Sequence, residues 1–253
     1  MIDSVAVIIG VFSLLPLVIQ RLTRKYIYFS VFALFAVVLH GLYFFGPNIL
    51  YLLCITFVIS TIAELVSLKT PLYCFGVRYR YDVHHKIFSS HVNLLGVYPI
   101  EIAFTWMIFK YISFVMAMMI TSVISLPIIL EVILIPLILV SLDFIIDPIA
   151  VKKTRLWHWE RGSCYFGIPV QNFIGWYLVG LVSTVIFMGF GVWKPLTFNV
   201  LLFLPILFYG SFLRHVSVLF TMDKQKAICG VLPVALWTAL AAVSLCVLFL
   251  QLN

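Results

Sequence analysis

The sequence predicts an all-α polytopic membrane protein, and this fold class follows from composition, hydrophobic runs and the placement of charges. Apolar residues make up 64% of the 253 residues, charged residues make up 10%, and the mean hydropathy is +1.18. A water-soluble domain carries about a quarter charged residues. This chain therefore cannot cover a water-exposed surface with polar groups. A soluble enzyme, a disordered tail, a nucleic-acid module and a disulfide scaffold are excluded.

Hydrophobic runs long enough to cross a bilayer recur along the whole chain. A membrane-spanning helix needs about 20 apolar residues. We expect about eight such helices, with seven as the alternative number, in one transmembrane domain that covers 1–253. The runs are approximately 2–20, 26–45, 48–66, 96–120, 124–146, 169–190, 196–213 and 227–251. Long loops, 67–95 and 147–168, follow the third and the fifth run.

The basic residues predict the orientation of these helices. If the chain crosses eight times, fourteen of the 16 lysines and arginines fall on one side, which the positive-inside rule assigns to the cytoplasm. Both termini are then outside, and both long loops are cytoplasmic. Topology in the cell membrane thus accounts for the net charge of +7 without a nucleic-acid partner. The fourteen are Arg21, Arg24, Lys25, Lys69, Arg78, Arg80, Lys86, Lys152, Lys153, Arg155, Arg161, Arg214, Lys224 and Lys226.

Four acidic residues lie in the predicted helices at a similar depth. Glu64 is near the end of the third helix and Glu101 near the start of the fourth. Asp143 and Asp147 close the fifth helix with i,i+4 spacing, so their carboxyls share one face. At about 1.5 Å per residue, the four lie within roughly 8 Å of one depth, and Asn172 in the sixth helix joins them. We expect a shared polar pocket; the alternative is that each carboxylate reaches the headgroups and pairs with Lys or Arg.

Other polar residues predict no metal site and no cofactor. The five cysteines form no CxxC pair, and the six histidines lack the HxxxH and HxxHH arrays of membrane di-iron enzymes. Lys110 lies near the middle of the fourth predicted helix and needs a buried partner, for which Glu131 and Glu101 are candidates.

Several motifs surround these acids, and together they resemble the membrane family of carotenoid biosynthesis proteins. Known members of that family include carotenoid 1,2-hydratases of the bisanhydrobacterioruberin hydratase type. The resemblance covers roughly residues 40–180, and its most specific part is the last motif. The motifs are Glu64, Phe75-Gly76-x-x-Tyr79-x-Tyr81, Gly96-Val97-x-Pro99 with Trp106, Asp143-x-x-x-Asp147-Pro148, Trp157-x-Trp159, and Gly162-x-x-Tyr165-Phe166-Gly167-Ile168-Pro169-x-x-Asn172-x-x-Gly175-Trp176.

The resemblance implies a lyase that adds water to a terminal double bond of an acyclic carotenoid or other isoprenoid. Protonation of that alkene gives a tertiary carbocation, and water then captures the cation. The acid must be neutral until it reacts, which burial or a neighbouring carboxylate favours. Asp143 and Asp147 suit this requirement, one as acid and the other as base, and Glu64 or Glu101 could take over either role.

Aromatic residues near the same depth are the candidates for binding the substrate. Aromatic faces stabilise a cation without reacting with it, although each residue could instead belong to an interfacial belt. Asn172 would hold water or donate a hydrogen bond. The candidates with it are Trp106, Trp176, Tyr165, Phe166, Tyr79, Trp157 and Trp159.

Three other functions remain open. A carotenoid cyclase begins with the same protonation, but an internal alkene captures the cation. An intramembrane prenyltransferase could use Asp143 and Asp147 to bind Mg²⁺ and a diphosphate, although only one aspartate-rich motif is present. A proton-coupled transporter could use the intramembrane acids as a relay. In each case the expected partners are a lipophilic molecule or membrane lipid.

Overall fold

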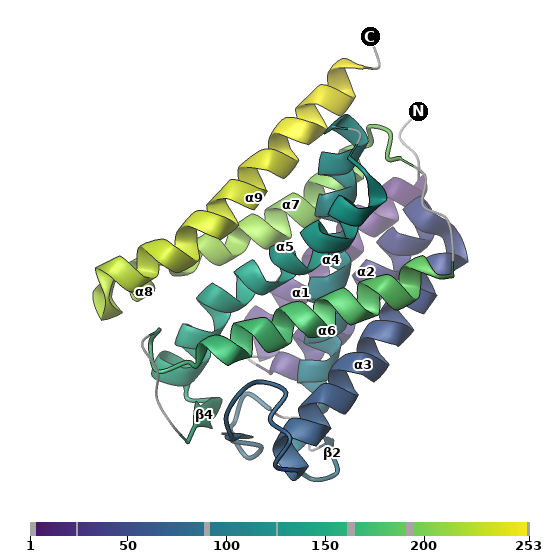
Figure 1. Ribbon diagram of the computed structural model, residues 1–253. Helices are drawn as coiled ribbons and strands as arrows, with labels where there is room; N and C mark the ends of the chain where they lie inside the picture. Colours follow the sequence, from purple (N-terminus) through teal and green to yellow (C-terminus); the bar gives the residue numbers. More distant parts are fainter. Residues whose placement is uncertain are drawn as a thin grey trace.

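The computed structural model describes residues 4–23, 25–88, 92–124, 126–160, 165–190 and 195–251. Most of these residues are helical, because a helix satisfies its backbone hydrogen bonds internally and so tolerates a lipid environment. Figure 1 shows the helices packed into one bundle. Three residues used above, Arg24, Arg161 and Gly162, lie outside the described residues.

Nine α-helices and four short helical turns follow each other along the described chain. The α-helices are α1 (Ser4–Thr23), α2 (Tyr26–Phe45), α3 (Ile49–Lys69), α4 (Ile100–Ile124), α5 (Ile128–Pro148), α6 (Val170–Met188), α7 (Phe203–Gly210), α8 (Val216–Met222) and α9 (Lys224–Leu250). The turns are η1 (Gly46–Asn48), η2 (Ile149–Thr154), η3 (Val200–Leu202) and η4 (Ser211–His215). The seventh predicted helix, 196–213, is thus the longer run from η3 to α8.

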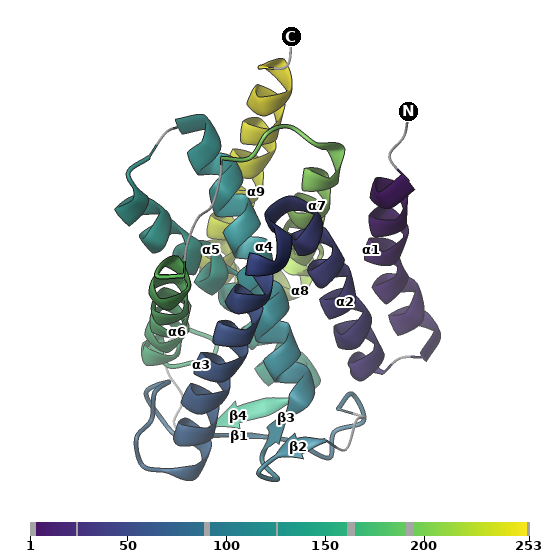
Figure 2. The ribbon, with the colours of Figure 1, turned by 90° about the vertical axis from the view of Figure 1, so that its right-hand side faces the viewer.

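Seven helical runs of the described residues are long and apolar enough to cross a membrane, which confirms the predicted fold class. One of them, Tyr26–Lys69, has 44 residues. A straight helix of that length would extend about 66 Å, roughly twice the hydrocarbon thickness. Instead the chain reverses at Gly46, where φ is +65°, and α3 runs back toward the end at which α2 began (Figure 2). Its two helices, α2 and α3, are each long enough to cross, so the seven runs offer eight membrane-spanning helices.

The two ends of the bundle differ. α1 begins and α9 ends at the same end, whereas the strands lie at the other (Figures 1 and 2). We call the latter the strand end. The positive-inside prediction assigns the strand end to the cytoplasm.

Within the described residues, two short antiparallel strand pairs form in the segments between α3 and α4 and between α5 and α6. β1 (Tyr79–Tyr81) pairs with β4 (Trp157–Trp159), and β2 (Asn93–Leu94) pairs with β3 (Tyr98–Pro99). In the first pair, Tyr79 lies opposite Trp159 and Tyr81 opposite Trp157. Because side chains alternate along a strand, these four rings share one face of the ribbon.

Helix α4 forms the centre of the bundle. It packs against α2, α3, α5, α7 and α9. In its most apolar 18-residue window 78% of the residues are buried, compared with 11% in α1. The apolar residues that α1 exposes are those expected to face lipid.

Lys110 on α4 is fully buried, but its partners are not the acids that the sequence suggested. Its ammonium group donates hydrogen bonds to the backbone carbonyl of Gly180 at 2.5 Å and to the hydroxyl of Thr184. Both partners are on α6. The proposed pairing of Lys110 with Glu101 or Glu131 is therefore wrong, because backbone and hydroxyl oxygens of a neighbouring helix satisfy the ammonium group.

Candidate active site

Glu64 projects from α3 into the interior near the strand end, where it is almost completely buried. Its Oε1 accepts a hydrogen bond from Nε1 of Trp106 at 3.1 Å. Its Oε2 accepts hydrogen bonds from the hydroxyl of Tyr81 at 3.1 Å and from the hydroxyl of Tyr79. All three donors are neutral, so Glu64 does not follow the alternative in which it pairs with Lys or Arg at the headgroups.

Asp143 and Asp147 on α5 are bridged by one side chain from α6. Nδ2 of Asn172 donates to Oδ2 of Asp143 at 2.7 Å and to Oδ2 of Asp147 at 2.6 Å. All three residues are buried. The i,i+4 spacing does bring both carboxyls to one helix face, and Asn172 reaches them because α5 and α6 pack along each other.

The two carboxyl sites face one small cavity, which we call the carboxyl cavity. Its volume is about 40 Å³, and its polar lining includes Glu64 from α3, Asp147 from α5 and Asn172 from α6. A buried water needs about 10–15 Å³, so there is room for roughly three or four waters. The remaining lining residues are Phe75, Tyr79, Tyr81, Ile102, Thr105, Trp106, Phe109, Ile146, Trp157, Trp159 and Trp176.

Aromatic rings form most of the cavity wall. The indoles of Trp106 and Trp176 stack with their centroids 4.0 Å apart. At the strand end, the β1–β4 ribbon contributes Tyr79 against Trp159 at 4.7 Å and Tyr81 against Trp157. The cavity is thus an aromatic chamber with carboxyls on two sides.

Two glycines allow the loop after α3 to reach this chamber. Gly76 has a φ of +89°, and a Cβ at this position would overlap the side chain of Gln171 on α6. A Cβ on Gly175 would lie 2.6 Å from the carbonyl oxygen of Cys74. The close approach of loop and helix places the ring of Phe75 beside Tyr79, with the ring centroids 5.9 Å apart.

The tyrosines that hold Glu64 are neutral donors. Burial, with a smaller effect of the nearby Glu64 carboxyl, raises the pKa of Tyr79 and of Tyr81 well above the ordinary value of about 10. Both hydroxyls therefore keep their protons in the physiological range and donate to Glu64.

Most of the candidate residues named from the sequence line the carboxyl cavity, but four do not. Asp143 is not in the lining but accepts a hydrogen bond from Asn172, which is. Glu101 is buried on α4 but is not in the lining, and it influences Tyr26 electrostatically instead. Tyr165 and Phe166 are also absent from the lining, and Tyr165 donates a hydrogen bond to the carbonyl of Phe144 at 2.6 Å.

Sequence reasoning missed some of the lining residues. Tyr81 belongs to a motif already noted, and the two-residue repeat of a strand would have placed it beside Tyr79. Phe109 and Thr105 lie three and one residues from Trp106 on α4, which gives a weaker signal in a helix that is buried almost all round.

The described residues include no cluster of three or more His, Cys, Asp or Glu that could hold a metal ion. The space between the facing oxygens of Asp143 and Asp147 holds the amide group of Asn172. The arrangement can hold water, and it offers carboxyls for proton transfer on both sides of that water.

Comparison with known proteins identifies the family. The family model described as carotenoid biosynthesis protein matches residues 25–245, which extends on both sides of the motif-bearing part, 40–180. Searches of the curated proteins and of the solved structures gave no match. Because the matched segment spans most of the chain, this multi-pass membrane protein belongs to the carotenoid biosynthesis protein family and has a role in making carotenoids.

Proposed function

We propose that the protein is a hydratase that adds water to the terminal double bond of an acyclic carotenoid. The observation that carries this proposal is the carboxyl cavity. Carboxyls from two helices, Glu64 and Asp147, face a space the size of a few waters, and aromatic rings enclose it. Acid, water, base and cation stabiliser are the components that hydration of an alkene requires.

Asp147 is the acid in this mechanism. Two ionised carboxylates that share one amide in a low-dielectric interior would repel each other strongly. In addition, Oδ1 of Asp143 is buried and receives no hydrogen bond from the described residues, which is unfavourable for an ionised group. A single proton shared by Asp143 and Asp147 removes both problems. Asp147 donates it, because Asp147 lines the cavity.

Glu64 is the base. Three neutral donors point at its two oxygens, and hydrogen bonds of this kind are strongest when the acceptor is an ionised carboxylate. A negative Glu64 on the opposite side of the cavity can orient a water molecule and accept its proton.

The reaction then proceeds in two steps. Asp147 transfers its proton to the less substituted carbon of the terminal alkene, and the positive charge develops on the dimethyl-substituted carbon. The water oxygen bonds to that carbon and releases a proton to Glu64, which gives a tertiary alcohol. Proton transfer from Glu64 back to Asp147 through cavity water restores the starting state.

The aromatic wall stabilises the intermediate cation. Indole faces attract cations most strongly among the aromatic side chains and form no bond with them. Trp106 is held in place, because its Nε1–H donates to Glu64 and its ring stacks on Trp176.

Product analysis tests this function. Purified protein in detergent is incubated with an acyclic carotenoid in isotopically labelled water, without nucleotide, and the products are analysed by mass spectrometry. A labelled tertiary alcohol is expected. A cyclic isomer of unchanged mass would overturn the proposal in favour of a cyclase. Absence of any product, together with proton-coupled flux in vesicles, would favour transport.

A further inference from the structure

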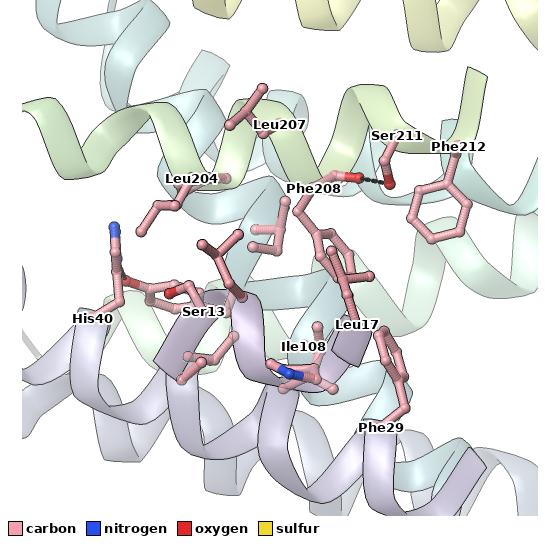
Figure 3. A pocket seen from close by; sticks show the side chains of 18 of the residues that line it. Ser13, Leu17, Phe29, His40, Ile108, Leu204, Leu207, Phe208, Ser211 and Phe212 are labelled. Atoms are coloured by element: carbon pink, nitrogen blue, oxygen red, sulfur yellow. Dashed lines mark hydrogen bonds between the residues drawn. The ribbon is translucent and has the colours of Figure 1, made fainter. Parts of the chain in front are cut away.

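A second and larger cavity borders a neighbouring face of α4. Its volume is about 220 Å³, and it lies between α1, α2 and α4 on one side and α7 and η4 on the other. Figure 3 shows side chains from these elements pointing toward each other across it. Most of its lining is apolar, and we call this space the apolar groove.

The apolar groove is long. His40 and Leu204 lie at one end of it, and Phe29 and Phe212 lie at the other (Figure 3). On α2, His40 and Phe29 are eleven residues apart, which corresponds to about 16 Å along a helix. The imidazole of His40 is hydrogen-bonded to the hydroxyl of Tyr111 and to the carbonyl of Leu201. The polar groups at that end are thus satisfied within the protein, and the groove offers a guest mainly hydrocarbon surface.

The apolar groove and the carboxyl cavity share a wall. Phe109 lines the carboxyl cavity, whereas Phe208 and Phe212 line the groove. The ring centroid of Phe109 is 6.2 Å from that of Phe208 and 5.5 Å from that of Phe212. A second connection runs from Thr105 in the carboxyl cavity through Tyr26, hydrogen-bonded at 2.9 Å, to the stacked ring of Phe29. Side chains that line one space therefore contact side chains that line the other.

The apolar groove also has an open side. Leu14, Leu17 and Leu207 line it, yet they are 59%, 49% and 54% exposed. They belong to α1 and α7, and α1 packs mainly against α2 at the edge of the bundle (Figure 2). Since lipid tails surround this part of the chain, a hydrocarbon can enter the groove sideways between α1 and α7.

We propose that the apolar groove binds the hydrocarbon chain of the carotenoid substrate while the end group of that chain reaches the carboxyl cavity past Phe109. The carboxyl cavity has room for a few waters and cannot hold a long polyene. The apolar groove adjoins it, is lined mainly by apolar residues, with Ser13, Ser211 and Arg214 among its polar ones, and is open to the bilayer, where the rest of the chain remains. Only the placement of the end group rests on the proposed function.

Filling the apolar groove from both walls tests this inference. Ala33→Phe places a ring in the groove from α2, and Leu204→Trp does so from α7, at a half-buried position that disturbs the core less. Val31→Phe, at a lipid-exposed position of α2, is the matched control. Binding is measured by the shift of the carotenoid absorption bands on titration into detergent-purified protein. Turnover is measured with a long acyclic carotenoid and with a short acyclic isoprenoid that has the same terminal alkene.

The two filling variants are expected to bind the long carotenoid about ten- to two-hundredfold more weakly, the range for loss of fit in an apolar pocket. The ratio of kcat/KM for the long substrate to that for the short one should fall by a similar factor. Val31→Phe should resemble the wild type. Wild-type binding in both filling variants would overturn the inference. The inference would also be overturned if phospholipid co-purified with the wild type but not with the two filling variants, while carotenoid binding was unchanged. If the wild type binds carotenoid but hydrates neither substrate, the proposed reaction fails while the binding data still decide the role of the groove.

Discussion

Glu64 and the Asp143–Asp147 pair approach the carboxyl cavity from different helices and have opposite surroundings. Three neutral donors point at Glu64, whereas the two aspartates share the amide of Asn172, and Trp157 is a further hydrogen-bond donor to Asp147. The donors around Glu64 stabilise its ionised form, whereas the closeness of the two aspartate carboxyls favours a pair that holds one proton. Three carboxyls at one depth are therefore not equivalent, and their hydrogen-bond donors suggest different parts in proton transfer. Substitutions on the two sides of the cavity can test this difference.

The largest effect is expected for Asp147→Asn. The substitution keeps the shape of the side chain but removes the proposed acid, so turnover should fall by about 100- to 10,000-fold, the usual contribution of general acid catalysis. Asp143→Asn is the paired comparison: Asp143 shares the proton but lies outside the cavity lining, so its substitution should reduce turnover less than that of Asp147. A greater loss in Asp143→Asn than in Asp147→Asn would reverse the assignment of the acid. Product formation per protein is the measurement, with monodisperse elution as the check of folding.

A smaller but still large loss is expected for Glu64→Gln. The amide of the variant cannot accept a proton from water. Its NH₂ group would also face hydrogen-bond donors, because in the wild type Trp106 donates to Oε1 and Tyr79 to Oε2. We expect turnover to fall by about a hundredfold, within the range for loss of a general base. Glu131→Gln, at a half-buried position in the first turn of α5, is the matched control. Equal activities of Glu64→Gln and the control would remove Glu64 from the mechanism.

Asn172→Ala should have an intermediate effect. It removes the amide that positions Asp147, and hydrogen bonds to charged groups contribute about 1.5–3 kcal/mol, which corresponds to roughly a 10- to 150-fold loss. Asp147 itself remains, so the residual activity should exceed that of Asp147→Asn. Gln171→Ala, on the adjacent position of α6, is the control for folding. An inactive Asn172→Ala protein that is as stable as this control would mean that Asn172 takes part in the chemistry directly.

The depth of the site could be predicted from the sequence, because the rise per residue of a helix is fixed. Glu64, Asp147 and Asn172 come from three helices, and counting from the ends of hydrophobic runs brought them to one level. The predicted start of the fourth helix, residue 96, was earlier than its start at Ile100. The reason is that the apolar segment Tyr98–Pro99 is in a strand pair, which hydropathy does not distinguish from a helix.

The direction in which each side chain points could not be predicted. Glu101 lies at the expected depth but on the side of α4 near Tyr26, since hydropathy gives no direction for a helix that is buried all round. The β1–β4 pairing joins residues nearly eighty positions apart through three-residue strands, which are too short to be recognised by alternation. Lys110 is hydrogen-bonded to a backbone carbonyl and a hydroxyl. A prediction that looks for a residue of opposite charge cannot identify such neutral partners.

The smallest effect is expected for Tyr79→Phe, which removes one of the hydroxyl donors to Glu64 and is tested by stability at alkaline pH. The pKa of Tyr79 is raised in the folded protein. The stability that comes from its neutral hydroxyl is therefore fully present below the pKa of the unfolded chain, about 10. It is lost as the pH rises toward the pKa of Tyr79 in the folded protein. The free energy of unfolding should fall above about pH 10 by up to about 1.4 kcal/mol per pH unit for this group. The thermal midpoint, measured in detergent from about pH 8 to about pH 11, should decline less steeply in Tyr79→Phe than in the wild type. Tyr51→Phe, at an exposed position of α3, is the matched control. Parallel declines in all three proteins would mean that ionisation of Tyr79 does not limit alkaline stability. The prediction drawn from its raised pKa would then be wrong.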